Sequence, residues 1–163
     1  MKAILQTCND IENRVGEIYQ QLVNHPDASA EQREIWQDMP HDALCHAHRI
    51  RLAADRLEMA GIKECGVTDL EVQGVFDRAD EIFHDAQAGT LSLDEAIYAS
   101  VELEDVFMKA HLVLANAGGQ PALQTMCKTL AEADREHTTR FNASLDRMQD
   151  GSGLVFDDGD PAS

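Results

Sequence analysis

Two segments of the chain carry a glutamate at matching places on apolar helical faces. Apolar residues three or four positions apart surround Glu12, and the same spacing recurs around Glu104. A second apolar stripe follows each glutamate, with His46 lying 34 positions after Glu12 and His137 lying 33 positions after Glu104. Such a stripe is the face that a helix buries. Acids and imidazoles on that face are costly unless they are paired, and a metal ion inside a bundle would pair them.

The position three residues before each histidine differs between the two repeats. Asp134 precedes His137 and offers a carboxylate, whereas Ala43 precedes His46 and offers only a methyl group. The neighbouring Asp42 could replace the missing carboxylate, because it lies four positions before His46 and because a kink at a proline inside the helix, Pro40, would turn it inward. The alternative is that Asp42 is solvated beside a site that has decayed.

Two further polar residues lie two helical turns beyond the glutamates. Tyr19 follows Glu12 and His111 follows Glu104, each by seven positions. We expect both side chains to form hydrogen bonds to carboxylates of the site rather than to bind metal. His111 remains an alternative ligand.

The elements that must position these residues are helices. Capping-box patterns start at Ser29, Thr68 and Ser92. Glycines at 61, 89, 118 and 119 indicate helix ends. The predicted helices span about residues 2–24, 30–60, 69–88, 93–116 and 121–149.

Short loops at 25–28 and 117–120 predict two antiparallel helical hairpins. The long connection at 61–92, with its own amphipathic helix at 69–88, would cross from one hairpin to the other. The sequence therefore predicts one all-α domain at 1–149. The acidic, glycine-rich segment 150–163 is expected to be a flexible tail, unless its apolar triplet at 154–156 docks onto a partner.

This arrangement resembles the ferritin-like di-metal family, and more closely its rubrerythrin-like branch. The family builds its site in a four-helix bundle from one glutamate on each of two helices and a Glu-x-x-His on each of the other two. By this resemblance Glu12 and Glu104 fill the single-glutamate positions, His46 and His137 the histidine positions, and Asp134 a shortened glutamate position. The implied fold is a bundle of two antiparallel hairpins with a helical crossover.

The resemblance also implies a function. The implied cofactor is iron, as a di-iron or mononuclear site, with manganese or zinc as alternatives. The implied activity is peroxide reduction or Fe²⁺ oxidation, in which Glu12 and Glu104 would be catalytic. The implied metal ligands are Glu12, His46, Glu104, Asp134 and His137. Asp42 is a further candidate ligand because of its position four residues before His46. The alternative function is a non-catalytic ferritin-like metal-binding or structural module with a degraded site.

The net charge and the cysteine pattern indicate which partners and which compartment are expected for the chain. The formal net charge of −17 argues against nucleic acid and anionic membranes and would attract metal cations. The four cysteines form no C-x-x-C pair, so a rubredoxin-type iron site is not expected and electrons would come from an external donor protein. No signal peptide pattern is visible, and Cys8 and Cys127 lie on buried stripes where a free cysteine behaves as a small apolar residue; both observations favour a reduced, cytoplasmic location. The expected assembly is a homodimer.

A second group of metal-binding side chains occurs on the helix predicted at 30–60. His41, Cys45 and His48 lie on the face opposite His46, with Asp38 one turn earlier. The group could hold a borderline metal at a surface or subunit interface. The alternative is an ordinary exposed polar face.

Overall fold

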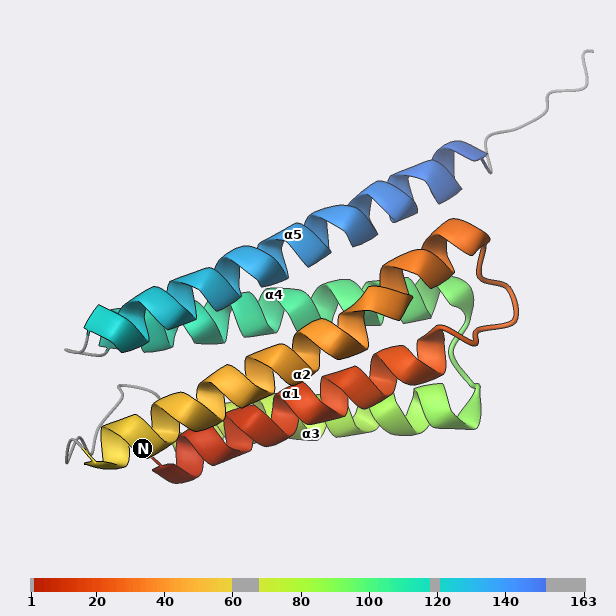
Figure 1. Ribbon diagram of the computed structural model, residues 1–163. Helices are drawn as coiled ribbons and strands as arrows, with labels where there is room; N and C mark the ends of the chain where they lie inside the picture. The colour runs from red at the N-terminus through yellow and green to blue at the C-terminus, as the bar shows by residue number, and fades with distance from the viewer. Residues whose placement is uncertain (1, 60–67, 118–120, 152–163) are drawn as a thin grey trace, which may run out of the picture.

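The described part of the chain, residues 2–59, 68–117 and 121–151, forms five α-helices in this computed structural model (Figure 1). They are α1 (Lys2–Leu22), α2 (Ala30–Met59), α3 (Asp69–Ala88), α4 (Leu93–Ala117) and α5 (Pro121–Gly151). The predicted all-α class is confirmed, and every helix end lies within two residues of its predicted position. The first two residues of the tail predicted at 150–163 belong to α5, and the rest of that tail lies outside the described residues. The predicted glycine stops at 61, 118 and 119 lie outside them too.

Local capping fixes the starts of two helices. At α2, the Ser29 amide donates to Gln32 Oε1 at 2.7 Å, while the Gln32 amide donates to Ser29 Oγ at 3.2 Å. At α4, Ser92 and Glu95 form the equivalent pair. Each box satisfies two amides that the helix itself leaves without partners, which confirms both predicted starts. The third capping-box pattern pairs Thr68 with Glu71, and the side chain of Glu71 lies outside the described residues.

The end of α3 is set by a glycine. Gly89 follows the last helical residue and has a φ of 65°. This left-handed conformation costs glycine little because glycine has no Cβ, so the chain can turn there toward α4.

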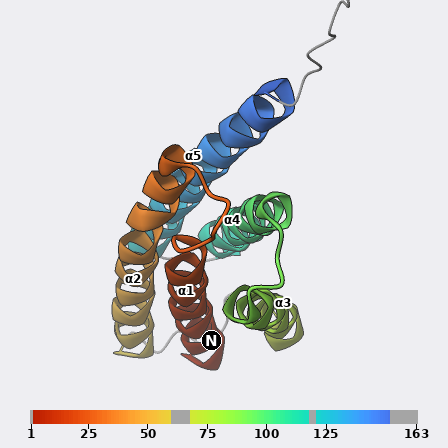
Figure 2. The same ribbon diagram turned by 90° about the vertical axis from the view of Figure 1, so that its right-hand side faces the viewer.

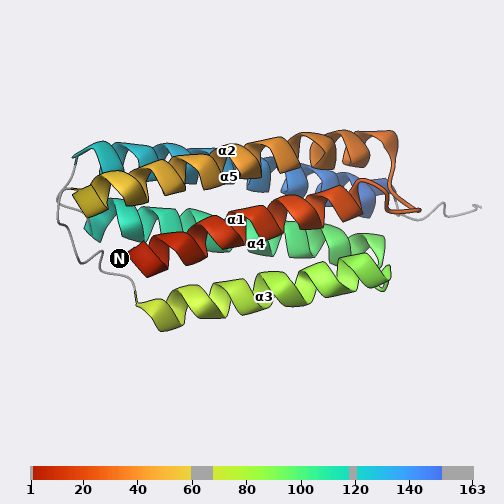
Figure 3. The same cartoon turned by 60° about the horizontal axis from the view of Figure 1, so that its bottom comes forward.

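The five helices form two hairpins with α3 as the connection. The colour gradient in Figure 1 shows that α1, α3 and α5 run in one direction and that α2 and α4 run in the opposite direction. The helix pairs α1/α2 and α4/α5 pack closely, and α3 packs mainly on α1 (Figures 2 and 3). Because α3 carries the chain back along the bundle, α2 and α4 are parallel. This order agrees with the predicted hairpin, crossover and hairpin.

Buried side chains join the two hairpins. The indole N–H of Trp36 on α2 donates to Ser100 Oγ on α4 at 3.1 Å. The rings of Tyr19 on α1 and Phe141 on α5 stack with centroids 6.1 Å apart. Large apolar side chains from α1, α2, α4 and α5 lie in the same core. Buried acids and histidines also lie between the helices.

The two helices of the first hairpin approach each other closely at Gly16. A Cβ added to Gly16 would lie 3.5 Å from Ala43 Cβ and 3.6 Å from the Pro40 carbonyl oxygen. The α2 helix continues through Pro40 as one element. Ala43 is thus a small side chain at a tight contact between α1 and α2.

The spacing at Gly16 is wide enough for one methyl group, because 3.5 Å is an ordinary van der Waals distance. We expect Gly16→Ala to raise the free energy of unfolding by about 0.5–1 kcal/mol, since alanine is the better helix former. Gly74→Ala in α3 is the matched control, because its Cβ would meet nothing within 4 Å. Urea titrations followed by the single tryptophan, Trp36, would measure both changes. A loss of stability in Gly16→Ala alone would contradict the 3.5 Å spacing at Gly16.

None of the helices within residues 2–59, 68–117 and 121–151 combines the length and the apolarity needed to cross a bilayer.

Candidate metal centre

Six acidic and imidazole side chains are buried together between the two hairpins. Each has at most 7% of its surface exposed, and together they come from all four helices of the two hairpins. They are Glu12 on α1, His46 on α2, Glu104 and His111 on α4, and Asp134 and His137 on α5. Every residue that the sequence places at the site is among them except Asp42, which is partly exposed.

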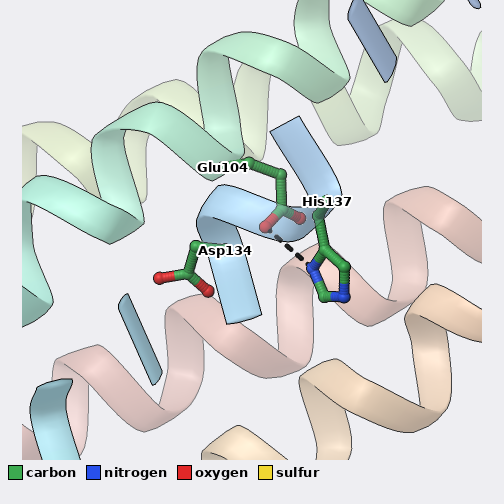
Figure 4. Close-up of side chains that lie close together, drawn as sticks. All are labelled: Glu104, Asp134 and His137. Carbon is green, nitrogen blue, oxygen red and sulfur yellow. Dashed lines mark hydrogen bonds and ion pairs between the residues drawn. The ribbon is translucent and has the colours of Figure 1, made fainter. Parts of the chain in front are cut away.

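Three of these side chains form the tightest group. Glu104, Asp134 and His137 each offer a potential ligand atom, and these atoms all lie within 4.8 Å of one another (Figure 4). All three residues are buried, and His137 Nδ1 lies 3.1 Å from Glu104 Oε2. In the part of the chain that the structure describes, no other set of three such residues is this compact. This group could hold a metal ion.

The repeat in the sequence becomes a repeat of contacts. His137 Nδ1 contacts Glu104 Oε2 in the second hairpin, and His46 Nδ1 lies 3.7 Å from Glu12 Oε2 in the first. Each histidine therefore faces the glutamate of its own hairpin. The two imidazole rings lie almost parallel with centroids 6.5 Å apart.

Further contacts cross between the hairpins. The Tyr19 hydroxyl on α1 donates to Glu104 Oε1 on α4 at 2.5 Å. His111 Nε2 on α4 lies 3.4 Å from Glu12 Oε1 on α1. The crossing follows from the antiparallel directions of α1 and α4, which place the residue two turns beyond one glutamate opposite the other glutamate. The prediction that Tyr19 bonds a carboxylate of the site is confirmed.

The prediction that His111 bonds a carboxylate of the site is also confirmed, and His111 reaches a second carboxylate as well. Its Nδ1 lies 2.7 Å from Asp134 Oδ2, and its Nε2 faces Glu12, so one imidazole lies between carboxylates of different hairpins. Its exposed fraction is 3%. His111 is equivalent to Tyr19 in the repeat. If α1 and α4 are assumed to be antiparallel, this equivalence predicts that His111 contacts Glu12, just as Tyr19 contacts Glu104.

Asp42, the residue before Ala43, contacts one histidine of the cluster. In one half of the cluster, Asp134 Oδ1 reaches across to His46 Nδ1 at 3.7 Å. In the other half Ala43, which is equivalent to Asp134, has no carboxylate to offer to His137. Asp42 Oδ2 instead lies 3.3 Å from His137 Nε2. The side chain of Asp42 is 43% exposed, so it also connects the cluster to solvent.

The charges in the cluster are set by competition between burial and pairing. Burial opposes charge on His111, but its contacts with Asp134 and Glu12 prevail and raise its pKa to about 10. Burial also opposes ionisation of Glu12, but His111 and His46 lower its pKa to about 2. For Glu104 and Asp134 burial prevails and raises the pKa. The metal-free cluster therefore holds a proton on His111 at neutral pH.

This protonation predicts how the stability of the metal-free protein depends on pH. The folded pKa of His111 lies above its unfolded value of 6.5, so its contribution is complete below pH 6.5 and is lost as the pH rises toward about 10. We expect the urea midpoint of the metal-free protein to fall across that range. Adding a metal ion that replaces the proton should reduce the fall. A midpoint that rises from pH 7 to pH 9.5 without metal would contradict this electrostatic account.

The second group of potential ligands, on the outer face of α2, is looser. Cys45 Sγ lies 3.7 Å from His41 Nε2, whereas His48 Nδ1 faces Arg51 at 3.2 Å. Asp38 lies 3.6 Å from Arg140. These partners fit the interpretation of a polar outer face better than that of a metal clip.

Comparisons with protein-family models, with curated proteins and with solved structures gave no match.

Proposed function

We propose that this chain is a ferritin-like, rubrerythrin-like di-metal protein and acts as an oxidoreductase of the peroxidase or ferroxidase type. The observation that carries the proposal is the compact, buried group of Glu104, Asp134 and His137. Its support is the second, incomplete set of Glu12 and His46, which repeats the first set across the bundle. Burying so many ionisable groups in one core is costly, and metal binding would offset that cost.

The donor set fits the implied metal. Carboxylate and imidazole ligands suit iron, manganese and zinc, and no thiol belongs to the cluster of six residues. One acceptor is also left over, because Glu12 Oε1 is buried and has no hydrogen-bond partner among the described residues. Glu104, Asp134 and His137 would hold the first ion. Glu12 and His46 would hold a second and weaker one, to which Asp42 would contribute only by exchanging its contact with His137 Nε2 for the ion.

Bound iron or manganese would supply electron-transfer chemistry toward peroxide or dioxygen. The residues of the chain would supply orientation and protons. Tyr19 fixes one oxygen of Glu104 by its hydrogen bond. Asp42 joins His137 to solvent and gives a proton a short route between water and the buried cluster. The helices around the cluster exclude bulk water from it.

A non-catalytic metal-binding or structural module is the second candidate. One observation in its favour is Ala43, which provides no carboxylate. Another is the contact of His111 with Asp134, which pairs a buried carboxylate with an imidazole without a metal ion. In this case the fold would keep the site of a di-metal protein without its reaction.

Metal stoichiometry and peroxide-driven oxidation separate the two candidates. The full chain would be purified without chelators, loaded anaerobically with Fe²⁺ and analysed for bound metal. Close to two irons per chain, together with Fe²⁺ oxidation that depends on peroxide and is lost in Glu104→Gln, is the expected result. One ion or none, with oxidation no faster than in buffer, would support the non-catalytic module. His84→Gln on the exposed surface of α3 is the control, because His84 lies outside the cluster.

A further inference from the structure

An apolar pocket leads from the surface to the edge of the cluster. It has a volume of about 240 Å³ and lies between α1, α3 and α4. Its walls include Val72 and Val75 from α3 and Val106 and Phe107 from α4. No part of the proposed metal site requires such a space.

The two ends of the pocket differ. Val113, which is 46% exposed, lies at the outer end. Glu12 and His111, each 3% exposed, lie at the inner end. A molecule in the pocket would therefore have its body among valines and its innermost atoms beside a carboxylate and an imidazole.

The inner end has an unused hydrogen-bond acceptor. Glu12 lines the pocket, and its Oε1 is fully buried without a hydrogen-bond partner among the described residues. His111 Nε2 lies 3.4 Å from this oxygen, which is longer than an ordinary hydrogen bond, so the imidazole attracts it by charge and leaves most of its hydrogen-bonding capacity open. Such an acceptor is costly to leave unsatisfied. A hydroxyl or N–H group at the inner end of the pocket would satisfy it.

We propose that this pocket binds a small neutral molecule with an apolar body and one hydroxyl or N–H group that donates to Glu12 Oε1, such as a monocyclic phenol. A cavity of about 150 Å³ is enough for benzene, so this pocket has room for a substituted ring. An anion is disfavoured by Glu12 at the inner end and by the net charge of −17. The two cationic side chains of the lining, Lys109 and His111, are already paired with carboxylates. The role of the molecule as a substrate of the cluster rests on the proposed function, whereas its binding does not.

Three probes that share a methyl-substituted benzene ring and differ in the opposite substituent test which chemical group the inner end of the pocket prefers. They are p-cresol with a hydroxyl, p-xylene with a methyl and p-toluate with a carboxylate, titrated calorimetrically into the metal-free full chain. We expect p-cresol to bind about tenfold or more tightly than p-xylene, because a hydrogen bond to a charged acceptor is worth at least that factor. We expect no saturable binding of p-toluate. Equal binding of p-cresol and p-xylene, or tighter binding of p-toluate, would overturn the proposal.

Two variants test the location. Ala110→Leu adds bulk to the pocket wall, and Val113→Phe narrows its outer end without entering the core. Each should weaken p-cresol binding at least tenfold. Ala88→Leu is the control, because it adds the same bulk at an exposed position at the end of α3, outside the pocket lining. It should change the affinity for p-cresol less than twofold. Unchanged binding in a folded Val113→Phe protein would overturn the location.

Metal measurements on the same variants separate this proposal from the proposed function. The pocket variants should bind as much metal as the unmodified chain, because they leave Glu104, Asp134 and His137 in place. His137→Ala should lose metal and still bind p-cresol, because His137 does not line the pocket. Absence of p-cresol binding in a chain that binds metal would overturn the pocket alone. Absence of metal in a chain that binds p-cresol would overturn the proposed function alone.

Discussion

Replacement of His137 by alanine is expected to lower metal affinity at least about 100-fold, whereas His46→Ala should lower it only about tenfold. His137 belongs to the compact group with Glu104 and Asp134, and it contacts Glu104 at 3.1 Å. His46 lies 3.7 Å from both of its carboxylate partners. Mutation of a residue that only hydrogen-bonds to a metal ligand typically lowers metal affinity 10–100-fold. Removal of a ligand itself, here His137 of the compact group, should therefore lower it more. Competition with a chromophoric chelator would measure both affinities.

The comparison of the two alanine variants has an internal control. Both remove a buried imidazole from the same cluster and should have similar effects on packing. Circular dichroism would establish that both variants remain helical. Equal losses of metal affinity would show that the two halves of the site do not differ and that Ala43 is fully compensated.

Ala43→Glu is expected to raise bound iron toward two ions per chain and to increase Fe²⁺ oxidation by peroxide. The substitution supplies a carboxylate where the repeat has Asp134 in the other hairpin. It should also destabilise the metal-free protein by about 2–4 kcal/mol, because it adds bulk beside Gly16 and buries an acid without a full set of partners. Metal loading should recover much of this loss. Elemental analysis and urea unfolding with and without metal would measure both effects.

Asp42→Asn is the complementary variant. If Asp42 replaces the missing carboxylate, its conversion to an amide should weaken the second ion in the unmodified chain and have a smaller effect when it is combined with Ala43→Glu. If Ala43→Glu changes neither metal content nor oxidation while the protein stays folded, position 43 does not face the site. Asp42 and His46 would then be the residues to test together.

Much of the fold follows from local chemistry. The starts of α2 and α4 follow from Ser29 and Ser92, because a capping box involves only residues three positions apart. The end of α1 depends less on local sequence signals. It falls at Leu22, two residues before the predicted end, because the chain tightens into a turn in which the Asn24 amide donates to the Gln21 carbonyl. Such turns depend on the loop as a whole.

The members of the cluster could be predicted from the repeat, but their pairing could not. His111 lies seven residues from Glu104, which is about 10 Å along one helix and too far for contact. Its partners, Glu12 and Asp134, depend on how α1 and α5 pack against α4. The contact of Asp42 with His137 likewise depends on the course of α2 beyond Pro40. These are tertiary relations between residues far apart in the chain.

Anomalous X-ray diffraction from crystals of the metal-loaded full chain tests the central claim most directly. Data collected on either side of the iron or zinc absorption edge would locate the bound ion without assumptions about its ligands. The predicted result is a peak about 2 Å from oxygen and nitrogen atoms of Glu104, Asp134 and His137. A peak at His41, Cys45 and His48 instead, or none in a folded protein soaked with Fe²⁺ and Zn²⁺, would contradict it.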